Sequence, residues 1–310
     1  MKIEHLQGLI AAPFTPMYED GNINTAVIPA YYKFLKHNGV TGAFICGSTG
    51  EGVSMTMEEK KAVTAAWAAC TKNDEDFKVM TLVGGNSLAD CKELAMYAQN
   101  VGLYGVSFTS PSYFKPAKVE VLAAMCEEIA DVVPDMPFYY YHVPVLTHVN
   151  FLMIDLLKAV SQNVPNFAGV KYTHEDFMDF LLCLQFNGGH YDMLWGRDEN
   201  MLAALALGSK GAVGSTFNYI APLYTRLTEA FNNGDWEHAR LLQVQSILMI
   251  QLLGKYGGIT VGKGYMKLAG LDCGGFRLPL TNMDAAQFER FKADVEETGF
   301  QQYKSSKTEL

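Results

Sequence analysis

Residues 166–173 have the sequence Asn-Phe-Ala-Gly-Val-Lys-Tyr-Thr. The short apolar run at 167–170 predicts a buried β-strand, which ends on Lys171, with Thr173 following where a helix can begin. A lysine at a strand end usually lays its stem along apolar surface and leaves the ammonium in water. The alternative is a lysine held in a dry pocket as a nucleophile for a carbonyl carbon. This stretch by itself leaves both interpretations open.

Seven other short apolar runs of this kind are spread along the chain. Together with this one they predict eight strands, at residues 8–15, 42–47, 79–84, 105–109, 137–141, 167–171, 193–196 and 211–214. Helical patterns separate them, at residues 26–38, 57–71, 119–131, 151–161, 176–185 and 200–207. Capping boxes are predicted at two helix starts, Thr56 with Glu59 and Ser87 with Asp90. Regular β-then-α alternation predicts a parallel sheet with right-handed crossovers, and eight units predict an α/β fold, the (β/α)8 TIM barrel.

The pattern becomes purely helical after about residue 220, with helices predicted at 224–232, 236–255, 265–269 and 285–297. We therefore expect residues 1–232 to form the barrel and residues 233–310 to form a C-terminal helical extension packed on it. A doubly wound open sheet is the alternative. However, no strand followed by G-x-G-x-x-G and a helix stands at the start of the chain, where a dinucleotide-binding fold would place it.

Composition and charge exclude several classes of protein. Hydrophobic residues make up 49% of the 310 residues and charged residues 18%, so a large core is available and global disorder is not expected. A net charge of -9 argues against binding to nucleic acid or to an anionic membrane. The longest apolar helical segment, 241–253, is too short and too rich in glutamine to span a bilayer. Six cysteines without a C-x-x-C pair and an N-terminus without a signal-peptide pattern predict reduced thiols in a cytoplasmic protein.

Polar residues follow five of the predicted strands, and in a barrel of this kind the active site lies at the C-terminal strand ends. The glycine-rich turn at 47–52 offers hydroxyls and backbone N–H groups that suit a carboxylate or phosphate. Each feature also has a plain structural explanation, such as a tight turn, a packed tyrosine or acids at a helix start. Their coincidence at one rim favours a site that contains Ser48, Thr49, Tyr141, Lys171, Gly196, Asp198, Glu199 and Ser215.

Other chemistries have little support in the sequence. The seven histidines show no H-x-x-x-H or H-E-x-x-H spacing, so no metal site is expected. Residues 257–264 nearly match the phosphate-binding pattern G-x-x-x-x-G-K-[ST], but Gly264 stands where a hydroxyl is needed and a helix precedes the segment instead of a strand. No G-x-S-x-G elbow of a serine hydrolase is present.

Four motifs, at residues 47–51, 141–144, 169–171 and 211–218, together resemble the dihydrodipicolinate synthase/N-acetylneuraminate lyase family. The resemblance extends over essentially the whole chain, and residues 6–9, 15–17 and 137–144 are most similar to the animal-like, sialic-acid-cleaving branch. It implies a TIM barrel with a C-terminal helical extension and class I (imine-forming) aldolase chemistry without a metal or dissociable cofactor. It also implies small-molecule substrates, sialic acid and pyruvate, and a homotetramer built as a dimer of dimers.

The resemblance also implies a role for each candidate residue. Lys171 corresponds to the lysine that forms the imine, and Tyr141 to the tyrosine that moves the proton of the C4 hydroxyl. Ser48 and Thr49 correspond to the positions that hold the pyruvyl carboxylate. Contacts to the sugar-derived part of the substrate are implied for Thr173, Gly196, Asp198, Glu199 and Ser215. Tyr113 stands where an aromatic side chain often enters a neighbouring subunit's site, although Ser112 replaces the bulky aromatic expected beside it.

Two alternatives remain at this stage. One is another pyruvate-dependent aldolase or synthase of the family, such as dihydrodipicolinate synthase or a keto-deoxy-sugar-acid aldolase. The other is a non-catalytic sugar-acid binding protein on the same fold, which the joint presence of Lys171 and Tyr141 disfavours. Dihydrodipicolinate synthases characteristically carry an arginine where this chain has Leu146, and leucine offers no donors to a second carboxylate.

Overall fold

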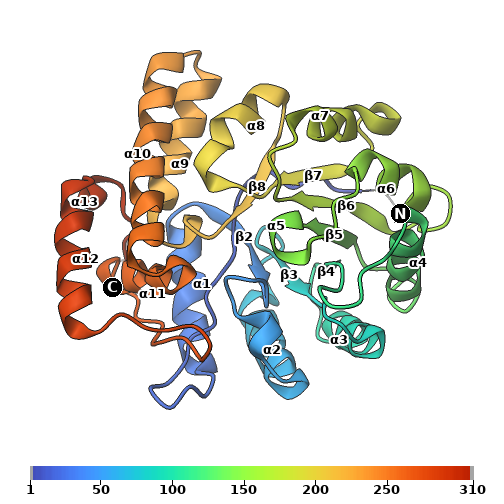
Figure 1. Ribbon diagram of the computed structural model, residues 1–310, viewed down its shortest axis with the longest axis horizontal. Coiled ribbons are helices and arrows are strands. Elements are labelled where there is room, and N and C mark those ends of the chain that lie inside the picture. Colours follow the sequence, from blue (N-terminus) through green and yellow to red (C-terminus); the bar gives the residue numbers. More distant parts are fainter. Residues whose placement is uncertain (1–2, 308–310) are drawn as a thin grey trace.

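The computed structural model describes residues 3–307 and contains a closed barrel of eight parallel strands (Figure 1). Each strand pairs with the next one in the sequence, and the first strand pairs with the last. The predicted (β/α)8 barrel is confirmed, and so is each of its strands: β1 (Gly8–Ala11), β2 (Val40–Ile45), β3 (Lys78–Leu82), β4 (Gly105–Phe108), β5 (Phe138–His142), β6 (Phe167–Tyr172), β7 (Asp192–Trp195) and β8 (Gly211–Gly214).

Helices follow the strands and cover the outside of the barrel. They are α1 (Ile28–His37), α2 (Met57–Thr71), α3 (Leu88–Asn100), α4 (Val119–Ala130), α6 (Met153–Val160), α7 (Phe177–Gln185), α8 (Met201–Leu207) and α9 (Phe217–Asn232), with the short α5 (Pro144–Thr147) after β5. The capping box predicted at the start of α2 is confirmed. At α3 only half of it forms: the Ser87 hydroxyl accepts from the Asp90 N–H at 3.2 Å, and aspartate is one methylene shorter than the glutamate that completes a capping box.

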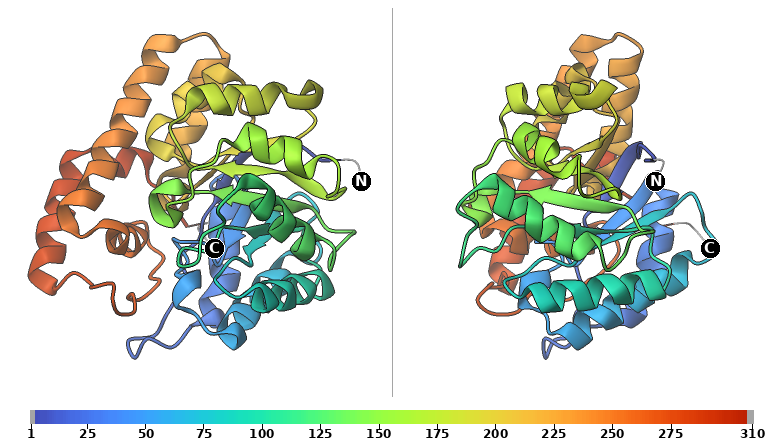
Figure 2. Two further views of the ribbon diagram at one scale, coloured as in Figure 1. Left: turned by 45° about the vertical axis from the view of Figure 1, so that its right-hand side comes forward. Right: turned by 90° about the vertical axis from the view of Figure 1, so that its right-hand side faces the viewer.

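The remaining helices gather on one side of the barrel, orange to red in Figure 1 and again in the left view of Figure 2. They are α10 (Trp236–Tyr256), α11 (Val261–Leu268), α12 (Ala285–Glu297) and α13 (Phe300–Tyr303). Tyr265 of α11 joins them to the barrel, because its ring stacks on Tyr219 of α9 at 4.5 Å and meets the edge of Phe291 of α12 at 4.9 Å. No helix among residues 3–307 has the length and apolar character that a membrane span requires.

Two helices begin earlier than the sequence pattern predicts. Helix α9 starts at Phe217 instead of residue 224, because a first turn forms and then breaks at Ile220, after which the helix continues with Pro222 in its interior. Helix α11 starts at Val261 instead of residue 265, so the glycine-rich segment once compared with a phosphate loop is largely helical. Its two helical glycines serve close packing: a Cβ on Gly262 would lie 2.2 Å from the Phe14 ring, and one on Gly264 would lie 2.8 Å from Met283.

Buried apolar side chains form two groups, one between strands and helices and one inside the barrel. The inner group includes Ile10, Phe44, Met80, Tyr139, Tyr141 and Leu194. A buried acid, Asp192, lies against it: its carboxylate accepts from the Leu6 N–H at 3.2 Å and from the Tyr139 hydroxyl at 3.0 Å. Burial raises the pKa of Asp192 to about 7. The inner group forms the apolar surroundings in which the candidate site residues lie.

Candidate active site

The inward position of Lys171 depends on an irregularity in β6. The register between β5 and β6 shifts by one residue at Ala168, which interrupts the ordinary alternation of inward and outward side chains. As a result Ala168 joins the inner group, Val170 packs outside, and Lys171 again faces inward. The neighbouring strand approaches so closely here that a Cβ on Gly169 would lie 1.8 Å from the Asp192 carbonyl oxygen. A glycine is therefore required two residues before the lysine.

Lys171 is 5% exposed, and its Nζ lies 4.1 Å from the ring centroids of both Phe44 and Tyr141. The two rings favour the ammonium by roughly 0.5–2 kcal/mol each, whereas burial disfavours it. Burial prevails and lowers the pKa of Lys171 from 10.5 to about 7, a change that corresponds to about 5 kcal/mol. About half of the lysine is then neutral at pH 7, compared with roughly one molecule in a few thousand for a free lysine. The structure therefore supplies a nucleophilic amine at neutral pH.

Tyr141 stands directly opposite Lys171 on the adjacent strand and is also 5% exposed. Burial raises the pKa of its phenol, and the hydroxyls of Ser48 and Thr173 oppose that effect. The Thr173 Oγ1 is buried and has no hydrogen-bond partner of its own within residues 3–307. The phenol is thus protonated at neutral pH and has two hydroxyl groups beside it, an arrangement suited to relaying a proton.

The turn after β2 presents Ser48 and Thr49. Its backbone closes on itself, because the Glu51 N–H donates to the Ser48 carbonyl and the Gly52 N–H donates to the Gly47 carbonyl, both at 3.1 Å. The N–H groups of Ser48 and Thr49 have no backbone acceptor within the part of the chain that the structure describes. Free N–H groups next to hydroxyls form a concave donor set of the kind that binds carboxylates and phosphates.

Asp198 is 6% exposed on the loop that follows β7. Its carboxylate accepts from the N–H and the hydroxyl of Thr216 at 2.8 and 2.7 Å. Burial raises its pKa to about 6, and the bonds from Thr216 limit that rise. The carboxylate is therefore mostly ionised at pH 7, and its charge favours the ammonium form of Lys171. It lies so close to β8 that a Cβ on Gly214 would come within 2.2 Å of its Oδ1.

Glu199 is less buried than its neighbour Asp198, although the sequence predicts the same kind of role for both acids. It is partly exposed and accepts from the Arg197 guanidinium at 2.6 Å. Gly196 has no room for a side chain, because a Cβ would lie 1.9 Å from the Thr173 Oγ1. Ser215 is partly exposed just after β8.

The comparison with known proteins identifies the family. Residues 5–298 match the model of the dihydrodipicolinate synthetase family. The chain belongs to this family. It is 38% identical to the N-acetylneuraminate lyase of Danio rerio over 90% of this chain and 92% of that one. Its structure matches the Proteus mirabilis N-acetylneuraminate lyase with a TM-score of 0.92 at 38% identity, covering 96% and 100% of the two chains. A Ruminococcus gnavus sialic acid aldolase, described as a catalytic lysine mutant, matches with a TM-score of 0.89 at 26% identity, covering 96% and 97%.

Within this family fold, the structure brings most of the predicted residues into one network. Lys171 touches Tyr141, and Ser48 and Thr173 lie beside the Tyr141 hydroxyl. Asp198 acts on Lys171 through its charge. Tyr113 enters none of the contacts described above: it is 77% exposed and packs edge-on against Phe114 at 4.9 Å. No group of three or more potential metal ligands occurs in residues 3–307.

Two residues of the site are absent from the sequence-based prediction. Phe44 forms one of the two rings against Lys171, yet a phenylalanine in an apolar strand carries no chemical signal in the sequence. Thr216 holds the Asp198 carboxylate in place and directly follows Ser215, which was selected. Its position just after β8, directly before α9, is the feature of the sequence that could have indicated it.

Proposed function

We propose that the chain is an N-acetylneuraminate lyase, a class I aldolase that cleaves N-acetylneuraminate to N-acetyl-D-mannosamine and pyruvate. The observation that carries the proposal is the buried Lys171, whose pKa falls to about 7 and whose Nζ lies against the Tyr141 ring. The lyase and aldolase relatives support the choice of substrate.

The first half of the reaction builds an electron sink on Lys171. Its neutral Nζ attacks C2 of the open-chain keto acid, and loss of water gives a protonated imine. Ser48 and Thr49 hold the neighbouring carboxylate with hydroxyl and N–H donors. The apolar surroundings of Lys171 keep the amine neutral before the attack and exclude water that would otherwise compete for it.

The second half breaks the C3–C4 bond. Tyr141 accepts the proton of the C4 hydroxyl while its own proton passes through the hydroxyls of Ser48 and Thr173 beside it, and the later protonation at C3 takes up one proton in return. The C3–C4 electrons move into the imine and form an enamine, and the sugar leaves as an aldehyde. Protonation of the enamine at C3 and hydrolysis of the imine then release pyruvate and restore Lys171.

The rim of the site suits a polyol chain better than a second carboxylate. Asp198 and Glu199 supply acceptors for sugar hydroxyls, Thr173 and Ser215 add hydroxyl groups, and Gly196 brings its backbone next to Thr173. Leu146, on α5, is 55% exposed and offers no donor to an acid. A carboxylate placed near the two acidic residues would be repelled.

A small panel of substrates tests this assignment. Pyruvate release is measured from N-acetylneuraminate and from a keto-deoxy sugar acid, and pyruvate is also incubated with aspartate semialdehyde. We expect efficient release from N-acetylneuraminate and no condensation with the semialdehyde. Condensation with the semialdehyde, without pyruvate release from N-acetylneuraminate, would replace the proposal with a synthase. Inactivity on every substrate would favour a binding protein.

We also propose that the protein is a cytoplasmic homotetramer, a dimer of dimers. Six free cysteines, five of them buried, fit a reducing compartment. Exposed aromatic side chains at Tyr113 and Phe114, which are 77% and 85% exposed, fit a contact between subunits. Light scattering coupled to size-exclusion chromatography measures the assembly directly, and a monomeric mass would refute it.

A further inference from the structure

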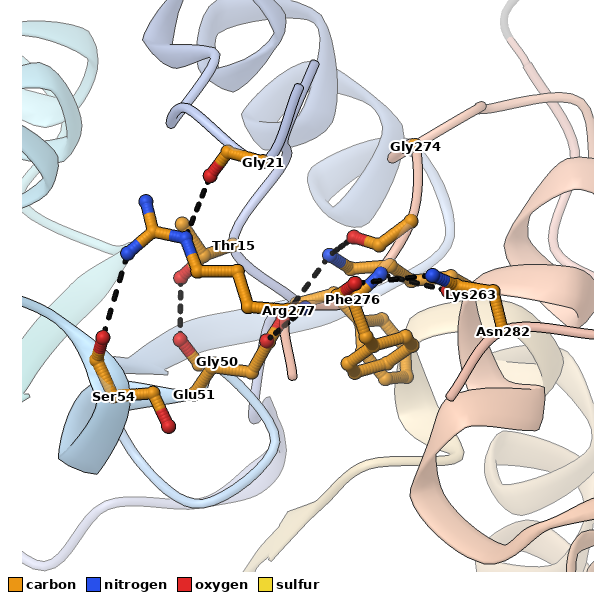
Figure 3. A network of polar contacts seen from close by, with 12 residues as sticks. Thr15, Gly21, Gly50, Glu51, Ser54, Lys263, Gly274, Phe276, Arg277 and Asn282 are labelled. Atoms are coloured by element: carbon orange, nitrogen blue, oxygen red, sulfur yellow. Dashed lines mark hydrogen bonds and ion pairs between the residues drawn. The ribbon is translucent and has the colours of Figure 1, made fainter. Parts of the chain in front are cut away.

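A buried ion pair links the turn after β2 to the C-terminal helices (Figure 3). The Lys263 Nζ on α11 lies 3.2 Å from the Glu51 Oε1, and the two side chains are only 3% and 1% exposed. The second carboxylate oxygen of Glu51 accepts from the Arg277 N–H at 3.1 Å. Lys263 also donates to the Gly275 carbonyl and lies 4.3 Å from the centroid of the Phe276 ring. Both carboxylate oxygens of Glu51 are thus bonded to residues of the segment 263–277, and Lys263 has a second acceptor in the same segment.

Stability alone is a weak reason to bury such a pair. Desolvation offsets much of the attraction between the charges, and apolar replacements of buried pairs are often neutral or stabilising. Burial lowers the pKa of Lys263, although the Glu51 carboxylate favours its ammonium form. However, an ion pair with a defined geometry also fixes the conformation of the segment on which its acidic partner lies. Here that segment is the turn with Ser48 and Thr49.

The backbone of this turn needs such support. Glu51 adopts the left-handed conformation with φ 57° and ψ 27°, which is unfavourable for a residue with a side chain. Gly52 lies so close to the strand that a Cβ would come within 1.8 Å of the Cys46 carbonyl oxygen. From the other side, the Thr15 hydroxyl donates to the Gly50 carbonyl at 2.6 Å. The turn is therefore held at Gly50 by the segment that follows β1 and at Glu51 by α11.

Arg277 adds a second connection to the same region. Its Nε donates to the Gly21 carbonyl at 2.6 Å, and its guanidinium forms a two-point ion pair with Glu59, one contact measuring 2.9 Å. Glu59 completes the capping box at the start of α2 with Thr56. The loop after α11 thus fixes both Glu51 and the beginning of the helix that follows the turn.

We propose that Lys263, acting through Glu51, is a positioning residue for the turn that binds the keto-acid carboxylate at Ser48 and Thr49. The C-terminal helices therefore set the affinity of the site for its substrate without touching it. This inference depends on the proposed function, because it takes the carboxylate of an imine-forming keto acid as the ligand of the turn.

The test separates recognition of the carboxylate from chemistry at the lysine. Borohydride trapping on Lys171 is measured against concentration for pyruvate and for acetone, which has the ketone but no carboxylate. In Lys263→Met we expect about a tenfold higher half-saturating pyruvate concentration, equivalent to about 1.4 kcal/mol. Trapping at saturating pyruvate and trapping with acetone should stay at the wild-type level. Lys267→Met is the matched control on the same helix, because Lys267 is 59% exposed and lies 3.6 Å from Asp272; it should resemble wild type throughout.

A second pair of variants guards against simple unfolding. Glu51→Gln, alone and combined with Lys263→Met, keeps an acceptor for Arg277 and leaves no buried unpaired carboxylate. Both should show the same selective loss for pyruvate, even where the melting temperature recovers. Equal losses for pyruvate and acetone, or an unchanged pyruvate dependence in a folded variant, would overturn the positioning role. Absence of trapping in the wild-type protein would instead refute the proposed function, and the inference with it.

Discussion

Replacing Phe44 tests whether burial is what makes Lys171 reactive. The Phe44 ring lies 4.1 Å from the Lys171 Nζ and acts on it in two opposite ways. It excludes water, which favours the neutral amine, and it presents its π-face, which favours the ammonium. A matched pair of variants separates these effects: Phe44→Leu keeps an apolar group, whereas Phe44→Asn has the same branched arrangement of side-chain heavy atoms as leucine and brings a polar group to the lysine.

The two variants should move the pKa of Lys171 in different directions. If asparagine raises it from about 7 to about 8, the neutral fraction at pH 7 falls from about one half to about one eleventh, a loss of about fivefold in imine formation. At pH 9 the amine is at least about nine-tenths neutral in both proteins, so the difference nearly vanishes. Leucine removes only the ring attraction of roughly 0.5–2 kcal/mol. The pKa of Lys171 in Phe44→Leu should therefore equal the wild-type value or lie below it.

The assay is the rate of borohydride trapping with saturating pyruvate from about pH 5.5 to about pH 9.5, a range that extends to both sides of the pKa of Lys171. Circular dichroism checks that each variant is folded. Because the neutral amine is the reactive form, the rate rises as pH increases through the pKa of Lys171 in the folded protein. The reasoning fails if both variants shift the midpoint in the same direction. It also fails if the Asn variant is slower by the same factor at every pH, since that result would indicate misplacement of the lysine instead of altered protonation.

Three further predictions concern the rest of the site. Tyr141→Phe keeps the ring and should lower turnover by roughly 10²–10⁴-fold in a folded protein; nearly unchanged turnover would make Tyr141 a packing residue. Glu199→Gln should raise KM for N-acetylneuraminate by about tenfold, the loss of one charge-assisted hydrogen bond, while pyruvate trapping on Lys171 stays unchanged; an equal effect on both would remove Glu199 from sugar recognition. Thr216→Val removes a hydrogen bond that lowers the pKa of Asp198, so Asp198 should become protonated at a higher pH than in wild type. The rate of cleavage should then begin to fall at a higher pH as the solution is acidified, and an unchanged pH profile would contradict this role of Thr216.

The architecture was readable from the sequence because the repeat of strands and helices is periodic and each strand is a short apolar run. Helix α11 was misjudged at its start because glycines usually interrupt helices, and only the proximity of the Phe14 ring explains why Gly262 is needed inside one. Likewise, the first turn of α9 and its kink at Ile220 precede Pro222, a residue type that ordinarily interrupts a helix.

The candidate site was predictable where polar residues follow strand ends and less so where function depends on packing. Lys171 could be selected because it stands at the end of an apolar strand. However, the register shift at Ala168 that turns its side chain inward arises from strand pairing, which no local sequence pattern reveals. The pairing of Glu51 with Lys263 joins residues 212 positions apart. Lys263 lies within the segment that resembles a phosphate loop only poorly, and only the fold places it behind the turn with Ser48 and Thr49.

The central claim is that Lys171 forms an imine with the keto acid, and reduction of the protein with borohydride in the presence of pyruvate tests it most directly. Reduction converts the imine to a stable secondary amine, so peptide mapping by mass spectrometry should find the reduced pyruvate adduct on Lys171, with none in Lys171→Met. An adduct on a different lysine, or an unmodified Lys171 at saturating pyruvate, would contradict the account.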